Sequence, residues 1–185
     1  MYWTSFSFLR MFLFIIIPLS SAYSEEEWNI DKFQTSAYAR VSGEVTHGDS
    51  LNFFIQSRDN CEKVSNTFTV YTHEKPGDIK QLLNKHIPIK INEEEYTAKV
   101  NNVSPFLMGY KVMFTIGTFP LKEYIYHLNN LYLKEKRFEI EIVNGVDFKA
   151  NKYFDVPHNN WKLEKLVPSI LEANKICKNI NNLES

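Results

Sequence analysis

Histidine is the side chain of this sequence whose chemistry is easiest to recognise from spacing, because closely spaced pairs bind metal ions. The five histidines stand at positions 47, 73, 86, 127 and 158. No two of them have the spacing of a zinc-binding pair, and the two cysteines are far apart in the sequence. We therefore expect surface histidines and predict neither a metal site nor a cofactor.

Carboxylates are the next candidates, since paired acids can perform acid–base chemistry when one of them is partly buried. Glu93–Glu95 falls between two predicted strands, in a turn where charges are solvated. Glu139 and Glu141 alternate with apolar residues, which is typical of the wet face of a strand. The sequence has no nucleophile elbow and no glycine-rich phosphate loop. We predict no catalytic residue. The alternative is a hydrolase whose site is assembled from distant residues such as His158, Asp155 and Glu141.

An aromatic and polar segment, 153–161, is the best candidate for binding. Pro157 restricts its backbone. One interpretation is a binding loop whose contacts come from Tyr153, Phe154, Asp155, His158 and Trp161. The other is a corner leading into the last helix, with Trp161 as its buried plug.

The N-terminus has the pattern of a secretory signal peptide. Arg10 precedes a nine-residue apolar run, 11–19, and the small residues Ser20-Ser21-Ala22 follow. The run is too short to cross a bilayer, which needs roughly 20 residues. We predict cleavage after Ala22 and a periplasmic or secreted protein; an uncleaved anchor is the alternative. No later stretch approaches membrane length.

Composition favours one ordinary domain. Removal of 22 of the 185 residues leaves 163, a common domain size. Of the 21 Lys and Arg residues only Arg10 is lost, so 20 basic and 22 acidic residues give a net charge of −2. This charge argues against nucleic acid as a partner. We predict a signal peptide (1–22), a lead-in (23–36), one globular β-rich domain (37–180) and a polar tail (181–185).

Cys61 and Cys177 are the two cysteines of the chain. In an oxidising compartment an even number of cysteines favours a disulfide, and two cysteines allow only one pairing. The bridge would close a loop of over a hundred residues, which is worth on the order of 4–5 kcal/mol. Two buried free thiols are the alternative.

Hydrophobic patterning predicts mostly antiparallel strands. Alternating or β-branched runs indicate strands at 37–41, 51–55, 67–72, 87–91, 96–100, 110–118, 137–142 and 146–150. Asn144-Gly145 between the last two is a strong hairpin signal. Helical spacing predicts helices at 79–85, 121–131 and about 161–180, the last starting properly near Pro168. The predicted fold is an α+β sandwich or open barrel of about eight strands, with two or three helices including a C-terminal one.

The C-terminal third has a recognisable rhythm. Strand, turn and strand lead to Tyr153-Phe154-Asp155, and then to a helix that ends at Cys177. An earlier Cys61 follows the first hairpin. In this spacing the chain resembles small periplasmic proteins of Gram-negative bacteria, loosely the invasion-associated locus B family. The resemblance implies a β-sandwich-like secreted domain without established enzymatic activity. The close-spaced cysteines of that family are absent, and no functional residue carries over.

Three functions are consistent with this sequence. The first is non-catalytic binding of a protein or another component of the cell envelope, since no catalytic constellation accompanies the β-rich core. The second is the hydrolase mentioned above. The third is a carrier of a small apolar ligand, for which a large cavity lined by Phe and Tyr would be the distinguishing feature.

Overall fold

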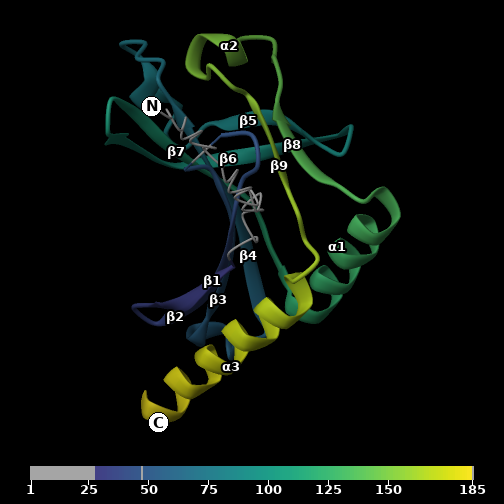
Figure 1. The fold of residues 1–185 in the computed structure, drawn as a ribbon. Coiled ribbons are helices and arrows are strands. Elements are labelled where there is room, and N and C mark those ends of the chain that lie inside the picture. The colour runs from purple at the N-terminus through teal and green to yellow at the C-terminus, as the bar shows by residue number, and fades with distance from the viewer. Residues whose placement is uncertain (1–27, 47, 185) are drawn as a thin grey trace, which may run out of the picture.

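A computed structural model describes residues 28–46 and 48–184 of the chain. The predicted signal peptide (1–22), and His47 among the histidines, lie outside the described residues. Figure 1 shows a single curled sheet with two long helices beside it. Within the described ranges, no helix is both long and apolar enough to cross a membrane.

Nine antiparallel strands form the sheet, in the order β1-β2-β3-β4-β7-β6-β5-β8-β9. Their bounds are β1 (Asn29–Phe33), β2 (Ser36–Ser42), β3 (Ser50–Gln56), β4 (Lys63–Thr72), β5 (His86–Ile91), β6 (Glu94–Phe106), β7 (Gly109–Pro120), β8 (Phe138–Ile142) and β9 (His158–Trp161). The predicted antiparallel fold is confirmed in its open form: one half-barrel sheet replaces the two layers of a sandwich.

The helices are α1 (Leu121–Glu135), α2 (Ala150–Tyr153) and α3 (Leu166–Glu184). Two short 3-10 turns, η1 (Ser57–Asp59) and η2 (Ile79–Leu82), complete the structure. The predicted C-terminal helix is confirmed, and Pro168 lies in its first turn, where a missing backbone N–H is tolerated. The helix predicted at 79–85 is the short 3-10 turn η2 and not an α-helix. The N–H groups of Leu83 and Lys85 donate to carbonyl oxygens three residues back, those of Lys80 and Leu82.

One core fills the inner side of the curled sheet, between the strands and the two long helices. Phe68 of β4 and Phe114 of β7 stack at its centre with their rings 4.6 Å apart. Ala37 and Ala39 of β2 are completely buried where α3 packs. Their small side chains let the helix approach the strand closely, which explains why alanine occurs in an otherwise bulky β pattern.

The strand predicted at 146–150 is wrong. Val146 is 98% exposed, and the Ala150 N–H donates to the Asn144 side chain over 3.0 Å. The Gly145 N–H similarly bonds to Phe148 O over 2.9 Å. The segment from Asn144 to Ala150 is therefore closed by these two local hydrogen bonds and leads into α2. Both edges of β8 are already paired, with β5 and with β9.

Cys61 and Cys177 form the predicted disulfide, with their Cα atoms 6.0 Å apart. The bridge joins α3 to the turn that follows β3 and η1. Both cysteines are buried, and the Asn174 side chain adds a 2.7 Å hydrogen bond to Cys61 O. A buried disulfide is consistent with folding in an oxidising compartment.

Candidate active or binding cavity

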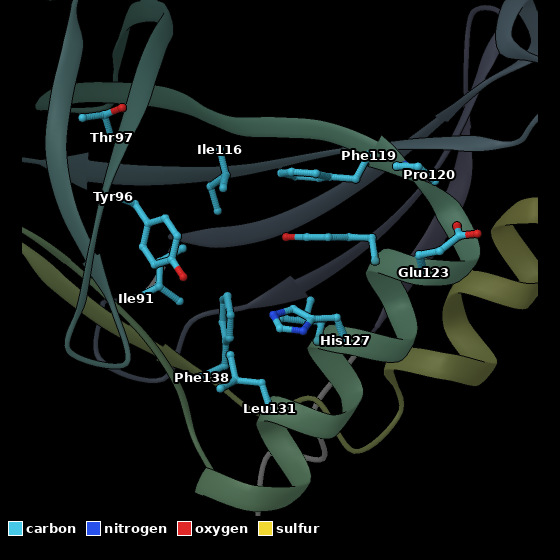
Figure 2. A pocket seen from close by; sticks show the side chains of 12 residues that line it. Ile91, Tyr96, Thr97, Ile116, Phe119, Pro120, Glu123, His127, Leu131 and Phe138 are labelled. Atoms are coloured by element: carbon cyan, nitrogen blue, oxygen red, sulfur yellow. The ribbon is translucent and has the colours of Figure 1, made fainter.

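A cavity of about 520 Å³ lies between α1 and the part of the sheet formed by β5, β6, β7 and β8. Its walls are mainly apolar. Figure 2 shows Ile91, Tyr96 and Ile116 facing it from the strands, and His127 and Leu131 facing it from α1. The Glu123 carboxylate points away from its centre in the same view. The volume lies within the range of about 300–1,000 Å³ that small-molecule sites occupy.

The α1 wall of the cavity follows from helical periodicity. Tyr124, His127, Leu128 and Leu131 recur three or four residues apart and so share one face of the helix. The sequence predicts this helix from the spacing of Tyr124, Ile125, Leu128 and Leu131, and it predicts His127 as a surface residue. Leu128 belongs to the buried core and also lines the cavity.

The β7 wall is shaped by an irregularity in the strand. Asn66 of β4 pairs with Gly117, but Thr67 pairs with Thr115, so Ile116 is an additional residue on β7. Such a bulge bends a strand and re-aims its side chains. Ile116 is one of the residues that line the cavity, so the bulge contributes directly to its shape.

Phe119 and Tyr124 make the aromatic wall where β7 runs into α1. Their rings stack with centroids 4.2 Å apart and an angle of 8° between their planes. Gly117 makes room for this pair, because a Cβ atom there would lie 2.5 Å from Phe119 Cζ. The Leu121 N–H bonds to Glu62 O over 2.8 Å, which fixes the start of α1 on the sheet.

The cavity runs from an exposed rim to a buried floor. Tyr96, Thr97, Glu123 and His127 are exposed. Leu128 and Phe138 are 3% and 1% exposed, respectively. A ligand could therefore enter from solvent and bury one end against apolar side chains.

Two phenols of the cavity remain protonated at neutral pH. Burial raises the pKa of Tyr124 to about 12. The Tyr96 hydroxyl donates to Glu94 over 2.6 Å, and this hydrogen bond raises the pKa of Tyr96. Both side chains are therefore neutral hydrogen-bonding groups. The cavity thus offers hydrogen bonds within apolar walls and no buried charge among the residues that line it.

The residues predicted from segment 153–161 do not form one exposed surface. Tyr153, Phe154 and Trp161 are buried, while Asp155 and His158 are exposed. Phe154 packs towards Phe114, with 5.9 Å between ring centroids. The ring centroid of Trp161 lies 6.4 Å from that of Phe138, the aromatic residue at the floor of the cavity. Trp161 therefore packs against the floor of the cavity from the core side.

The residues of the alternative enzyme site are only partly brought together. Glu141 of β8 and His158 of β9 are cross-strand partners, and Asp155 precedes β9 in the connection from α2. None of the three lines the cavity. Within residues 28–46 and 48–184, no group of three or more His, Cys, Asp or Glu side chains is placed to hold a metal ion.

No family model matches this sequence, and comparison with curated proteins and with solved structures gives no match. The resemblance to the invasion-associated locus B family therefore stays a prediction. The site has to be interpreted from its own geometry.

Proposed function

We propose that this protein binds a small apolar ligand in the cavity between α1 and strands β5–β8, and that it acts as a carrier or binding protein. The observation that supports this proposal is the combination of about 520 Å³ of space, largely apolar walls and an exposed rim. A cavity of about 150 Å³ holds one benzene molecule, so this one suits a ligand of about three rings. The hydrolase alternative lacks comparable support, since Glu141, Asp155 and His158 lie outside the cavity lining.

The expected affinity is moderate. A ligand of three rings has about 20 non-hydrogen atoms, and about 0.3 kcal/mol per atom gives a binding free energy of about −6 kcal/mol. This corresponds to a Kd in the range of tens of micromolar. Titration with phenylnaphthylamine, an uncharged fluorophore of this size whose emission rises in apolar surroundings, covers that range.

A pair of tryptophan variants tests the location. Leu131 lines the cavity, whereas Leu133 of the same helix is about half exposed and does not line it. Leu131→Trp fills the cavity and is expected to weaken phenylnaphthylamine binding at least tenfold. Leu133→Trp adds the same side chain outside it and is expected to leave binding unchanged. Equal binding by wild type and Leu131→Trp would contradict the proposal.

We also propose that the protein is exported to the periplasm or secreted after cleavage behind Ala22. The Cys61–Cys177 disulfide supports this, because stable bridges of this kind form in oxidising compartments. The apolar run at 11–19 and the small residues before Tyr23 supply the cleavage pattern. Mass spectrometry of the exported protein should find Tyr23 as the first residue. An intact Met1 would rule out the cleavage.

A further inference from the structure

The Tyr124 hydroxyl is the polar group of the cavity wall with the most distinctive surroundings. Asn66 of β4 is completely buried, and its Nδ2 donates to Tyr124 Oη over 2.5 Å. An oxygen that accepts this hydrogen bond keeps its own proton free for another partner. Within the described part of the chain, Asn66 Oδ1 has no hydrogen-bond partner, so it does not receive that proton.

The surroundings of Tyr124 make it an effective donor. A phenol that accepts a hydrogen bond becomes polarised and donates more strongly. Because burial raises its pKa to about 12, the proton stays in place at any physiological pH. Stacking against Phe119 fixes the ring, so the direction of the hydroxyl is set before a ligand binds.

The other polar groups of the cavity are less able to select a ligand. Tyr96 already donates to Glu94. Thr97 and His127 lie on the exposed rim, where water competes for their hydrogen bonds. Glu123 lines the cavity and Glu94 accepts the hydrogen bond from Tyr96, so two carboxylates lie near this rim and disfavour an anionic ligand.

We propose that the ligand is an uncharged molecule with an apolar body and a hydrogen-bond acceptor, such as a ketone, ester or ether oxygen, that the Tyr124 hydroxyl binds. This inference rests on the proposed function and deepens it from a shape preference to a chemical class. A partly buried donor discriminates between ligands more sharply than an exposed one, because a ligand without an acceptor leaves it unpaired.

Two probes of equal shape test this class. Phenyl naphthyl ketone has the acceptor. Its methylene analogue is the alkene in which a =CH2 group replaces the carbonyl oxygen, and it lacks the acceptor. Their affinities follow from displacement of phenylnaphthylamine. Tyr124→Phe is expected to weaken ketone binding about tenfold, the usual effect of losing one hydrogen bond, and to change binding of the methylene analogue less than about twofold. The matched control is Tyr126→Phe, on an exposed position of α1, which should affect neither probe.

The outcomes separate the two proposals. Equal loss of both probes in Tyr124→Phe would overturn the acceptor class while leaving the cavity as a binding site. Failure of phenylnaphthylamine and both probes to bind wild type would overturn the proposed function itself. If Tyr124→Phe does not fold, the infrared carbonyl band of the ketone bound to wild type decides. A band shifted below its position in alkane supports the hydrogen bond, and an unshifted band overturns it.

Discussion

Asn159 and Asp49 stand 110 positions apart in the sequence, yet Asn159 Nδ2 donates to Asp49 Oδ2 over 2.8 Å. The other carboxylate oxygen accepts the Tyr71 N–H over 2.7 Å. Asn159 Oδ1 in turn accepts the Val45 N–H over 2.9 Å. These bonds join edge strand β9 to the connection between β2 and β3, so they hold the curled sheet in its shape.

Asp49 gives this junction a dependence on pH. The side chain is 1% exposed, and burial raises the pKa of Asp49 to about 6 from an ordinary value of 3.8. The folded protein therefore binds this proton more tightly than the unfolded chain does. Because the ionised carboxylate opposes folding, protonation of Asp49 stabilises the folded protein. This group therefore raises the free energy of unfolding by on the order of 3 kcal/mol as the pH falls from about 7 to about 4.

Asp49→Asn tests this contribution because it removes the titration and keeps the shape. Urea denaturation of both proteins from about pH 7.5 to about pH 4.5 gives the difference in free energy of unfolding at each pH. That difference should shift in favour of wild type as the pH falls. Asparagine has one side-chain oxygen fewer, so the variant loses one hydrogen-bond acceptor and its stability changes by a constant amount at every pH. The informative quantity is therefore the slope of the stability difference against pH. A difference that is constant with pH would show that Asp49 does not titrate in this range.

Local patterning predicted the strands well where one face is buried. In β8, Phe138 and Ile140 are buried and alternate with Glu139 and Glu141, and this strict alternation identifies the strand from sequence. The pattern failed at Asn144, whose side chain accepts a backbone N–H six residues later, so a hairpin signal became a local cap. The four residues of β9 are too few for an alternating pattern to show.

The cavity depends on pairings that sequence patterning does not contain. Phe138 reaches the cavity only because β8 pairs with β5, and these two strands are not consecutive in the sequence. The bulge at Ile116 is a register shift against β4, and the adjacent Gly117 is a weak sequence signal for it, because an isolated glycine in a strand often marks a bulge. The aromatic and apolar stripe of α1, from Tyr124 to Leu131, was the available signal. It predicts a buried face and does not distinguish packing from a cavity.

The disulfide should contribute a large part of the stability. It closes a loop with a sequence separation of 116 residues, for which loop-closure entropy gives about 4–5 kcal/mol. Replacing both Cys61 and Cys177 by alanine is expected to lower the free energy of unfolding by about that amount, measured by urea denaturation. Wild type in reducing agent should show a similar loss. An unchanged denaturation midpoint in either experiment would contradict this prediction.

Leu107 occupies an unfavourable backbone conformation at the tip of the β6–β7 hairpin. Its φ is +49°, and its side chain is 85% exposed, so no burial compensates for the strain. Asparagine and glycine adopt this region more readily, by roughly 1 kcal/mol. Leu107→Asn should therefore raise the free energy of unfolding by about that amount. The adjacent Met108→Asn, at a residue without positive φ, should give no such gain in the same denaturation experiment. Equal effects of the two changes would show that lost apolar exposure, not φ, is responsible.

Gly117 connects the shape of the sheet to the proposed binding cavity. An added Cβ would meet Phe119 at 2.5 Å (Cζ) and 2.9 Å (Cε2), so the ring has to move. Stacking on Tyr124 restricts where it can go. Gly117→Ala is therefore expected to disturb the aromatic wall, to lower the free energy of unfolding by about 1–3 kcal/mol, and to weaken phenylnaphthylamine binding several-fold.

Gly77→Ala is the matched control for this change. A Cβ at Gly77 meets no atom within 4 Å, and its φ is not positive, so alanine fits there without strain. Its stability should stay the same or rise by up to about 1 kcal/mol, because alanine restricts the unfolded chain. Its affinity for phenylnaphthylamine should match that of wild type. If Gly117→Ala lowered stability yet bound the fluorophore as wild type does, the Phe119–Tyr124 pair would be a packing feature and not a wall of the binding site. A loss of binding confined to Gly117→Ala ties ligand affinity to the position of the Phe119 ring.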